Sequence, residues 1–124
     1  MTTALPIGIT LFTIALISYT VATMAGVFGG GLKKWHIIVF WLGFAGDATG
    51  TLVIGAANGG FVWNFHSIIG TIALLAMLAQ NIGAVMAYGS GDEARMAAYP
   101  KKVSLPVWGV WIASFVTGLY LARA

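Results

Sequence analysis

The chain has 124 residues, of which 60% are hydrophobic and only 7% are charged. Soluble domains carry roughly 25% charged residues, so this composition excludes an ordinary soluble domain. The net charge is +3, and the lack of cysteine excludes disulfides, thiolate metal sites and covalently attached c-type haem.

Four apolar segments predict membrane-spanning helices, because an α-helix needs about 20 residues to cross the hydrocarbon core. Their ranges are 5–28, 35–57, 67–88 and 103–122. The segments are apolar all round, whereas spanning strands alternate in polarity. Glycine and proline mark the connectors, residues 29–34, 58–60 and 89–102, as expected loops. We therefore predict one all-α integral membrane domain over residues 1–124, an up-down bundle of four transmembrane helices.

Segment 35–57 carries a carboxylate, Asp47, near its centre. A central aspartate costs about 2.5–3.5 kcal/mol on insertion scales, so we expect it to face the bundle and to have a partner. Helical periodicity places His36, Phe40, Gly43 and Thr51 on the same face. One interpretation is a packing role, with Asp47 bonded to Thr51 or to a hydroxyl on another helix. The other is a proton-carrying group or a partner of a cofactor.

The glycines on this face predict the close approach of another helix. Gly46 and Gly50 form a small-xxx-small pair, the spacing that allows two helix backbones to come together.

The two histidines are expected at opposite ends of the bundle, His36 at the start of the second helix and His66 just before the third. A hairpin between these helices brings His36 level with Gln80 and Asn81, whose side chains are costly in lipid and should face the bundle or the interface. The separation means that the two histidines cannot ligate one iron from opposite faces. Each histidine is either a hydrogen-bonding anchor at the interface or a ligand with another partner.

The fourth segment carries a stripe of polar and aromatic side chains at helical spacing: Ser104, Trp108, Trp111, Phe115 and Gly118. This stripe is typical of core packing or of an aromatic belt, and the alternative is the wall of a flat apolar cofactor site.

Basic residues gather in two of the connectors: Lys33, Lys34, Arg95, Lys101 and Lys102. Because basic loops stay in the cytoplasm, we predict a multi-pass protein of the bacterial inner membrane with both termini outside. The lipid bilayer is its expected partner. Nucleic-acid binding is not expected, because no folded basic face is indicated.

Residues 33–118 resemble the small four-helix bacterial membrane proteins of the HsmA family, which is named for a haem-sensing, haem-binding membrane protein. The resemblance lies in "KKWHIIVFWLGFAGDATGT", "NFHSIIGTIALLAMLAQ" and "VSLPVWGVWIASFVTG". Its most specific motifs are W-H, W-L-G-F and D-x-T-G-T. The family usually has a histidine where this chain has Gln80 and another near Lys101, whereas His36 and His66 are present here.

The resemblance implies a protein that captures haem b in the membrane. We expect His36 to supply the axial ligand to the iron, beside Phe40 and Gly43 and level with Gln80, with His66 as a further candidate for cofactor binding. The alternative function is a non-catalytic accessory or scaffolding subunit of a larger respiratory or photosynthetic membrane complex. Besides lipid, the expected partners are such a complex or, in a homo-oligomer, further copies of this chain. An enzyme is not expected, because the sequence shows no constellation of nucleophile and base.

Overall fold

The computed structural model describes residues 4–60 and 64–123, and these form an all-α bundle with no strand among them. Its elements are α1 (Ala4–Phe28), α2 (Lys34–Ala57), α3 (Phe65–Gly89), α4 (Glu93–Tyr99), the π-helix η1 (Pro100–Ser104) and α5 (Leu105–Arg123). Within the described residues, four helical stretches are long and apolar enough to cross a membrane, the last formed by α4, η1 and α5 together. The expected four-helix membrane bundle is confirmed.

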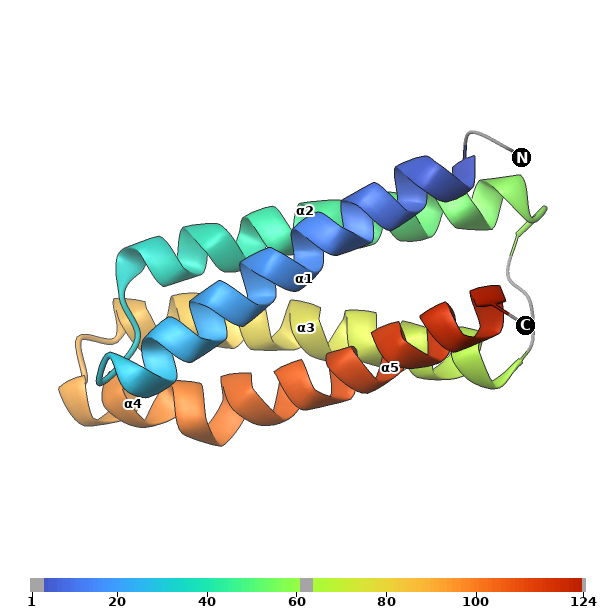
Figure 1. Ribbon diagram of the computed structural model, residues 1–124. Helices are drawn as coiled ribbons and strands as arrows, with labels where there is room; N and C mark the ends of the chain where they lie inside the picture. The colour runs from blue at the N-terminus through green and yellow to red at the C-terminus, as the bar shows by residue number, and fades with distance from the viewer. Residues whose placement is uncertain (1–3, 61–63, 124) are drawn as a thin grey trace.

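Successive long helices run in opposite directions (Figure 1). One end of the bundle therefore holds the start of α1, the end of α2, the start of α3 and the end of α5. The connection from α1 to α2 lies at the other end, beside α4. The two basic connectors of the sequence thus share one end, which we call the basic end.

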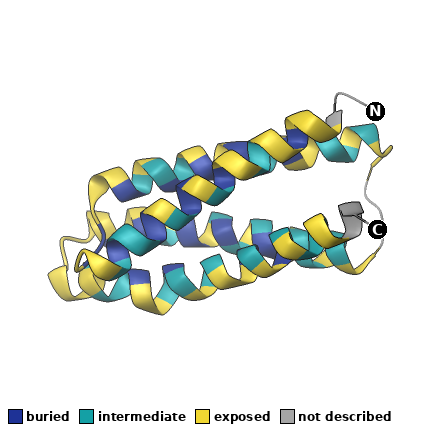
Figure 2. Cartoon of the chain, viewed as in Figure 1, coloured by how far each residue is buried: buried dark blue, intermediate teal, exposed yellow. Residues whose placement is uncertain are grey.

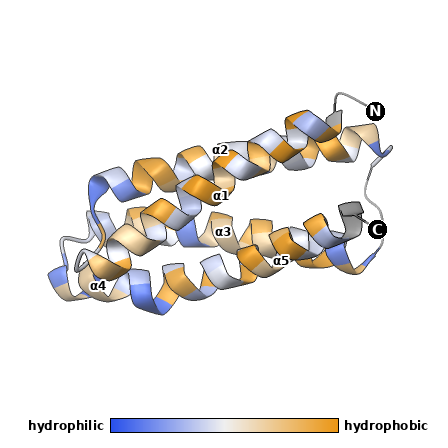
Figure 3. Ribbon diagram, viewed as in Figure 1, coloured by the Kyte–Doolittle hydropathy of each residue, from blue (hydrophilic) through white to orange (hydrophobic). Residues whose placement is uncertain are grey.

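Hydrophobic residues occur along every long helix, and the buried residues lie on the parts of the helices that face one another (Figures 2 and 3). Large side chains such as those of Ile38, Leu42, Leu75 and Val116 are exposed. Such a surface suits hydrocarbon, because a membrane protein has its apolar faces covered by lipid rather than by water. The structure is that of a multi-pass membrane protein in contact with a bilayer.

Glycines on α2 bring α1 against it along most of its length. A Cβ atom built on Gly46 would lie 2.9 Å from the backbone oxygen of Leu11, and one on Gly43 would lie 2.8 Å from the ring of Tyr19. A side chain at either position would push α1 away. The expected close helix partner of the glycine face is therefore α1.

The segment between the third and fourth spans differs from the expected loop over 89–102, because it becomes helical at Glu93. Asp92 caps α4 by accepting a hydrogen bond from the backbone N–H of Arg95 at 3.2 Å. Pro100 has no N–H to donate, and the backbone N–H of Leu32 instead donates to the oxygen of Met96 at 3.0 Å. The wider π-turn of η1 then carries the chain past the proline into α5.

Candidate functional site

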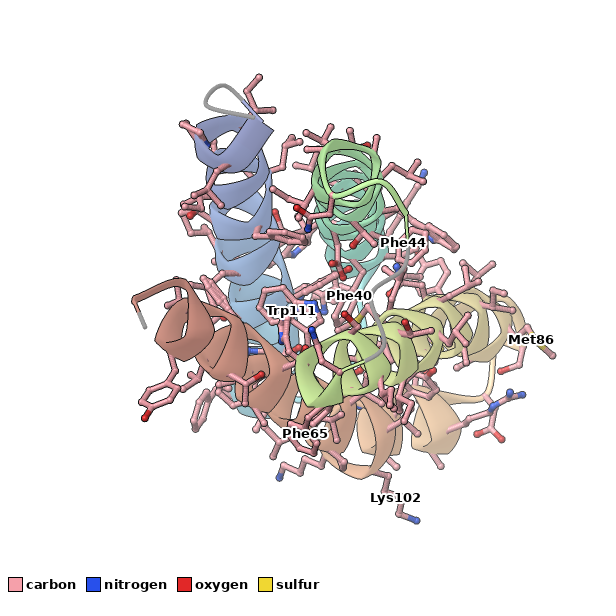
Figure 4. The ribbon with its side chains drawn as sticks, turned by 90° about the vertical axis from the view of Figure 1, so that its right-hand side faces the viewer. Phe40, Phe44, Phe65, Met86, Lys102 and Trp111 are labelled. Carbon is pink, nitrogen blue, oxygen red and sulfur yellow. The ribbon has the colours of Figure 1, made fainter. Side chains whose placement is uncertain are left out.

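Asp47 lies in the interior of the bundle and joins three helices. Its Oδ2 atom accepts hydrogen bonds from the Tyr19 hydroxyl of α1 at 3.0 Å and from Trp111 Nε1 of α5 at 2.8 Å. The rings of Tyr19 and Trp111 also meet edge to face, with centroids 5.1 Å apart. Figure 4, a view along the bundle, shows Trp111 in the middle of the four long helices.

For a packing role of Asp47, two hydrogen-bond partners were expected, Thr51 or a hydroxyl on another helix, and the structure shows the second. The partner is a hydroxyl on another helix, while the Thr51 hydroxyl donates to the backbone oxygen of Asp47 and not to its carboxyl group, at 2.8 Å. Because its two donors come from α1 and α5, Asp47 ties the closely packed α1–α2 pair to the other half of the bundle.

A second polar cluster lies nearer the basic end and is centred on Gln80. The Gln80 Nε2 donates to Asn81 Oδ1 at 2.7 Å, and the Ser104 hydroxyl donates to Gln80 Oε1 at 2.6 Å. Asn81 Nδ2 in turn donates to the backbone oxygen of Phe40 at 3.2 Å, and the Tyr99 hydroxyl donates to the backbone oxygen of Gln80 at 2.6 Å. The cluster therefore joins α2, α3, α4 and η1 through groups that satisfy one another.

His36 is buried at the start of α2, where it acts as a helix cap. The backbone N–H of Lys33 donates to His36 Nδ1 at 3.0 Å, the reciprocal contact of a capping box. A neutral imidazole has one N–H and one lone pair, so this bond places the proton on Nε2.

This arrangement does not fit the expected haem ligand. A ligating histidine offers the lone pair of one ring nitrogen and donates a hydrogen bond from the other. In His36 the lone pair is already taken by Lys33, and Gln80 is engaged with Asn81 and Ser104. Phe40 and Gly43 share the face of His36 as expected, but they are packed inside the bundle, with Phe40 1% exposed.

His66 has the opposite arrangement, at the end of the bundle away from the basic connectors. It lies inside α3 rather than before it, because Asn64 caps the helix by accepting from the backbone N–H of Ser67 at 2.8 Å. Its Nδ1 lies 3.0 Å from the Thr117 hydroxyl oxygen, and that hydroxyl donates to the backbone oxygen of Ser114 at 2.7 Å. When the Thr117 hydroxyl donates to Ser114, its oxygen accepts a hydrogen bond from His66 Nδ1–H, and the lone pair of the ring then lies on Nε2.

An apolar groove of about 520 Å³ lies between the start of α3 and the end of α5, and His66 is part of its wall. The other lining residues are Asn64, Phe65, Val116, Thr117 and Tyr120. The groove is open to the outside of the bundle, and its accessible wall is almost entirely apolar. An imidazole beside an apolar wall is what a haem site requires, and His66 has both, whereas His36 is capped by Lys33 and packed inside the bundle.

Gly118 makes room for the imidazole ring beside the groove. A Cβ atom built there would lie 2.8 Å from His66 Cε1 and 3.0 Å from His66 Nε2. The ring can therefore rest on the backbone of α5 only because this position is glycine.

Comparison of the chain with family models, with curated proteins and with solved structures finds no match.

Three residues complete these sites without having been assigned to them from the sequence. Tyr19 and Trp111 hold Asp47, and Thr117 orients His66. Trp111 was part of the predicted aromatic stripe, but the sequence did not indicate its hydrogen bond to Asp47. A tyrosine inside an otherwise apolar span was the available signal for Tyr19, because a buried phenol hydroxyl needs a hydrogen-bond partner.

Proposed function

We propose that this chain is a small haem-binding protein of the bacterial inner membrane, similar in role to the HsmA family, and that His66 would hold the iron. When bound, haem would supply an iron that takes an imidazole nitrogen as axial ligand. His66 would bind through Nε2, and Thr117 would orient the ring by accepting a hydrogen bond from Nδ1–H. The walls of the groove would keep water from one side of the macrocycle.

The observation that carries this proposal is the hydrogen bonding of His66. The chain has two histidines. The backbone N–H of Lys33 occupies Nδ1 of His36, whereas His66 can donate from Nδ1 to Thr117 and keep a lone pair on Nε2. This is the arrangement in which histidine ligates metals. The groove beside it supplies an apolar surface for a flat ligand.

The position of the groove supports capture rather than electron transfer. If the basic connectors are cytoplasmic, as their charge indicates, the groove lies on the outer side of the membrane. His36 lies at the far end of the bundle, so the described residues offer one histidine at the groove. Electron-transfer haems such as those of cytochromes c have axial ligands on both faces of the iron.

Titration of the purified protein in detergent with haemin, followed by absorption spectroscopy, tests the proposal. We expect the wild-type protein to develop a haem band and His66→Ala to lose it. Thr117→Val should weaken haem affinity by about 10- to 100-fold, the usual effect of removing a group that orients a ligating histidine. His36→Gln is the matched control, because glutamine at this position preserves a capping box while removing the imidazole.

A haem band that survives in His66→Ala but disappears in His36→Gln would place the site at the basic end and refute our assignment. A wild-type protein that takes up no haem would refute the function itself. The accessory-subunit alternative would then be tested by purification in mild detergent, where a larger membrane complex should accompany the chain.

A further inference from the structure

The Thr23 hydroxyl of α1 is buried and has no hydrogen-bond partner among the described residues. A buried polar group without a partner costs free energy, so native structures pair nearly all of them. Threonine in a helix can satisfy itself by donating to the carbonyl four residues earlier. Thr10, Thr13 and Thr51 do so here, with bonds of 2.7–2.8 Å. Thr23 lies in the same helix as Thr10 and Thr13 but does not make this bond.

The neighbours of Thr23 along α1 show which part of the bundle it faces. One turn earlier, Thr20 accepts a hydrogen bond from Trp108 Nε1 of α5 at 3.0 Å. One turn later, Gly26 lies against Pro100 of η1, where an added Cβ would come within 2.8 Å of Pro100 Cγ. Thr23 therefore faces the stretch between Pro100 and Trp108.

Ser104 lies within this stretch, at the end of the π-helix, and is 1% exposed. Its hydroxyl proton is used in the bond to Gln80 Oε1. A hydroxyl oxygen also has two lone pairs, so Ser104 Oγ can still accept a hydrogen bond. π-turns and inserted waters are recurring causes of local irregularity in helices.

We propose that a water molecule is bound inside the bundle between α1 and η1, where it bonds to the Thr23 hydroxyl and donates to Ser104 Oγ. A buried water requires two to four polar partners, and these two groups meet the minimum. The water completes the pairing of Thr23 and connects α1 to the Gln80 cluster. It thereby joins the α1–α2 pair to the other half of the bundle at the basic end, as Asp47 does near its middle.

Two measurements on the full chain in detergent test the proposal. The first is transfer of magnetisation between long-lived bound water and nearby protein protons in NMR spectra. We expect a cross-peak from bound water near Thr23 in the wild-type protein and in Thr23→Ser, and its loss in Thr23→Val. The second is the midpoint of thermal unfolding, which Thr23→Val should lower. Thr13→Val is the matched control, because its hydroxyl bonds only its own helix, and we expect it to lower the midpoint less.

A water-bonded and an unpaired Thr23 hydroxyl predict opposite effects of valine, whereas a hydroxyl bonded to its own helix predicts the same small loss as in Thr13→Val. If the hydroxyl bonds a water, valine removes that bond and leaves Ser104 with one partner fewer. If the hydroxyl has no partner, valine removes an unpaired polar group and the midpoint rises. The proposal would be overturned by a raised midpoint, by a midpoint lowered no more than in Thr13→Val, or by a wild-type protein without a bound-water cross-peak near Thr23.

Discussion

Asp47→Leu should lower the free energy of unfolding of the bundle, because it leaves the buried donors of Tyr19 and Trp111 without an acceptor. These side chains are 0% and 4% exposed. An unsatisfied buried donor costs about 1–3 kcal/mol, so the two together predict a loss of about 2–6 kcal/mol. The effect of Asp47→Leu on the state in which the helices are separated also lowers the free energy of unfolding. A carboxyl group there would face lipid at a cost of about 2.5–3.5 kcal/mol, and leucine removes this reason for the helices to associate.

Asp47→Asn is the control, since its carbonyl oxygen can accept both hydrogen bonds in the same place. We expect its loss to stay below about 1.5 kcal/mol, the upper range for a typical single hydrogen bond. Tyr19→Phe and Trp111→Phe each remove one donor. Hydrogen bonds in membrane proteins average about 0.6 kcal/mol and reach about 1.7 kcal/mol in double-mutant cycles, so each change should cost less than Asp47→Leu.

Unfolding of the variants by SDS in mixed micelles, followed by tryptophan fluorescence, measures these differences. An Asp47→Leu variant as stable as the wild-type protein would show that the two hydrogen bonds do not hold the bundle together. An Asp47→Asn variant as unstable as Asp47→Leu would show that the carboxyl group itself is required, and the packing role argued from the two donors would be wrong.

Two further predictions concern packing and orientation. Gly46→Ala should lower the free energy of unfolding by about 1–3 kcal/mol through overpacking, because the added Cβ would meet the backbone of α1. Gly55→Ala should instead raise it by about 0.5–1 kcal/mol, because no atom lies within 4 Å of the added Cβ. Equal effects of the two variants in the SDS titration would contradict this reasoning. Cysteines placed at Ser90 and Asn58 test the orientation in intact cells, where an impermeant thiol reagent should label only Asn58→Cys; labelling of Ser90→Cys alone would reverse it.

The number and position of the membrane spans could be predicted from the sequence, because hydropathy is a sum over residues that are neighbours in the chain. The inward direction of Asp47 could be predicted for a similar reason, since a carboxyl group is costly in lipid wherever the other helices lie. The segment from Glu93 to Lys102 became helical where a loop was expected, because its proline was interpreted as a break. Leu32, distant in sequence, supplies the donor that Pro100 lacks, and this contact exists only in the folded bundle.

The amino-acid sequence alone is sufficient to predict an apolar four-helix chain with an inward-facing carboxyl group, a glycine face and two histidines at opposite ends. Which groups form hydrogen bonds with one another depends on the tertiary structure. The partners of Asp47 lie 28 and 64 residues away in the chain, and that of His66 lies 51 residues away. A hydrogen bond requires two atoms within about 3 Å, and their separation depends on how each helix is rotated about its axis and shifted along its neighbours. The same dependence sets which ring nitrogen of each histidine carries the proton, and hence which histidine has a lone pair available for a ligand.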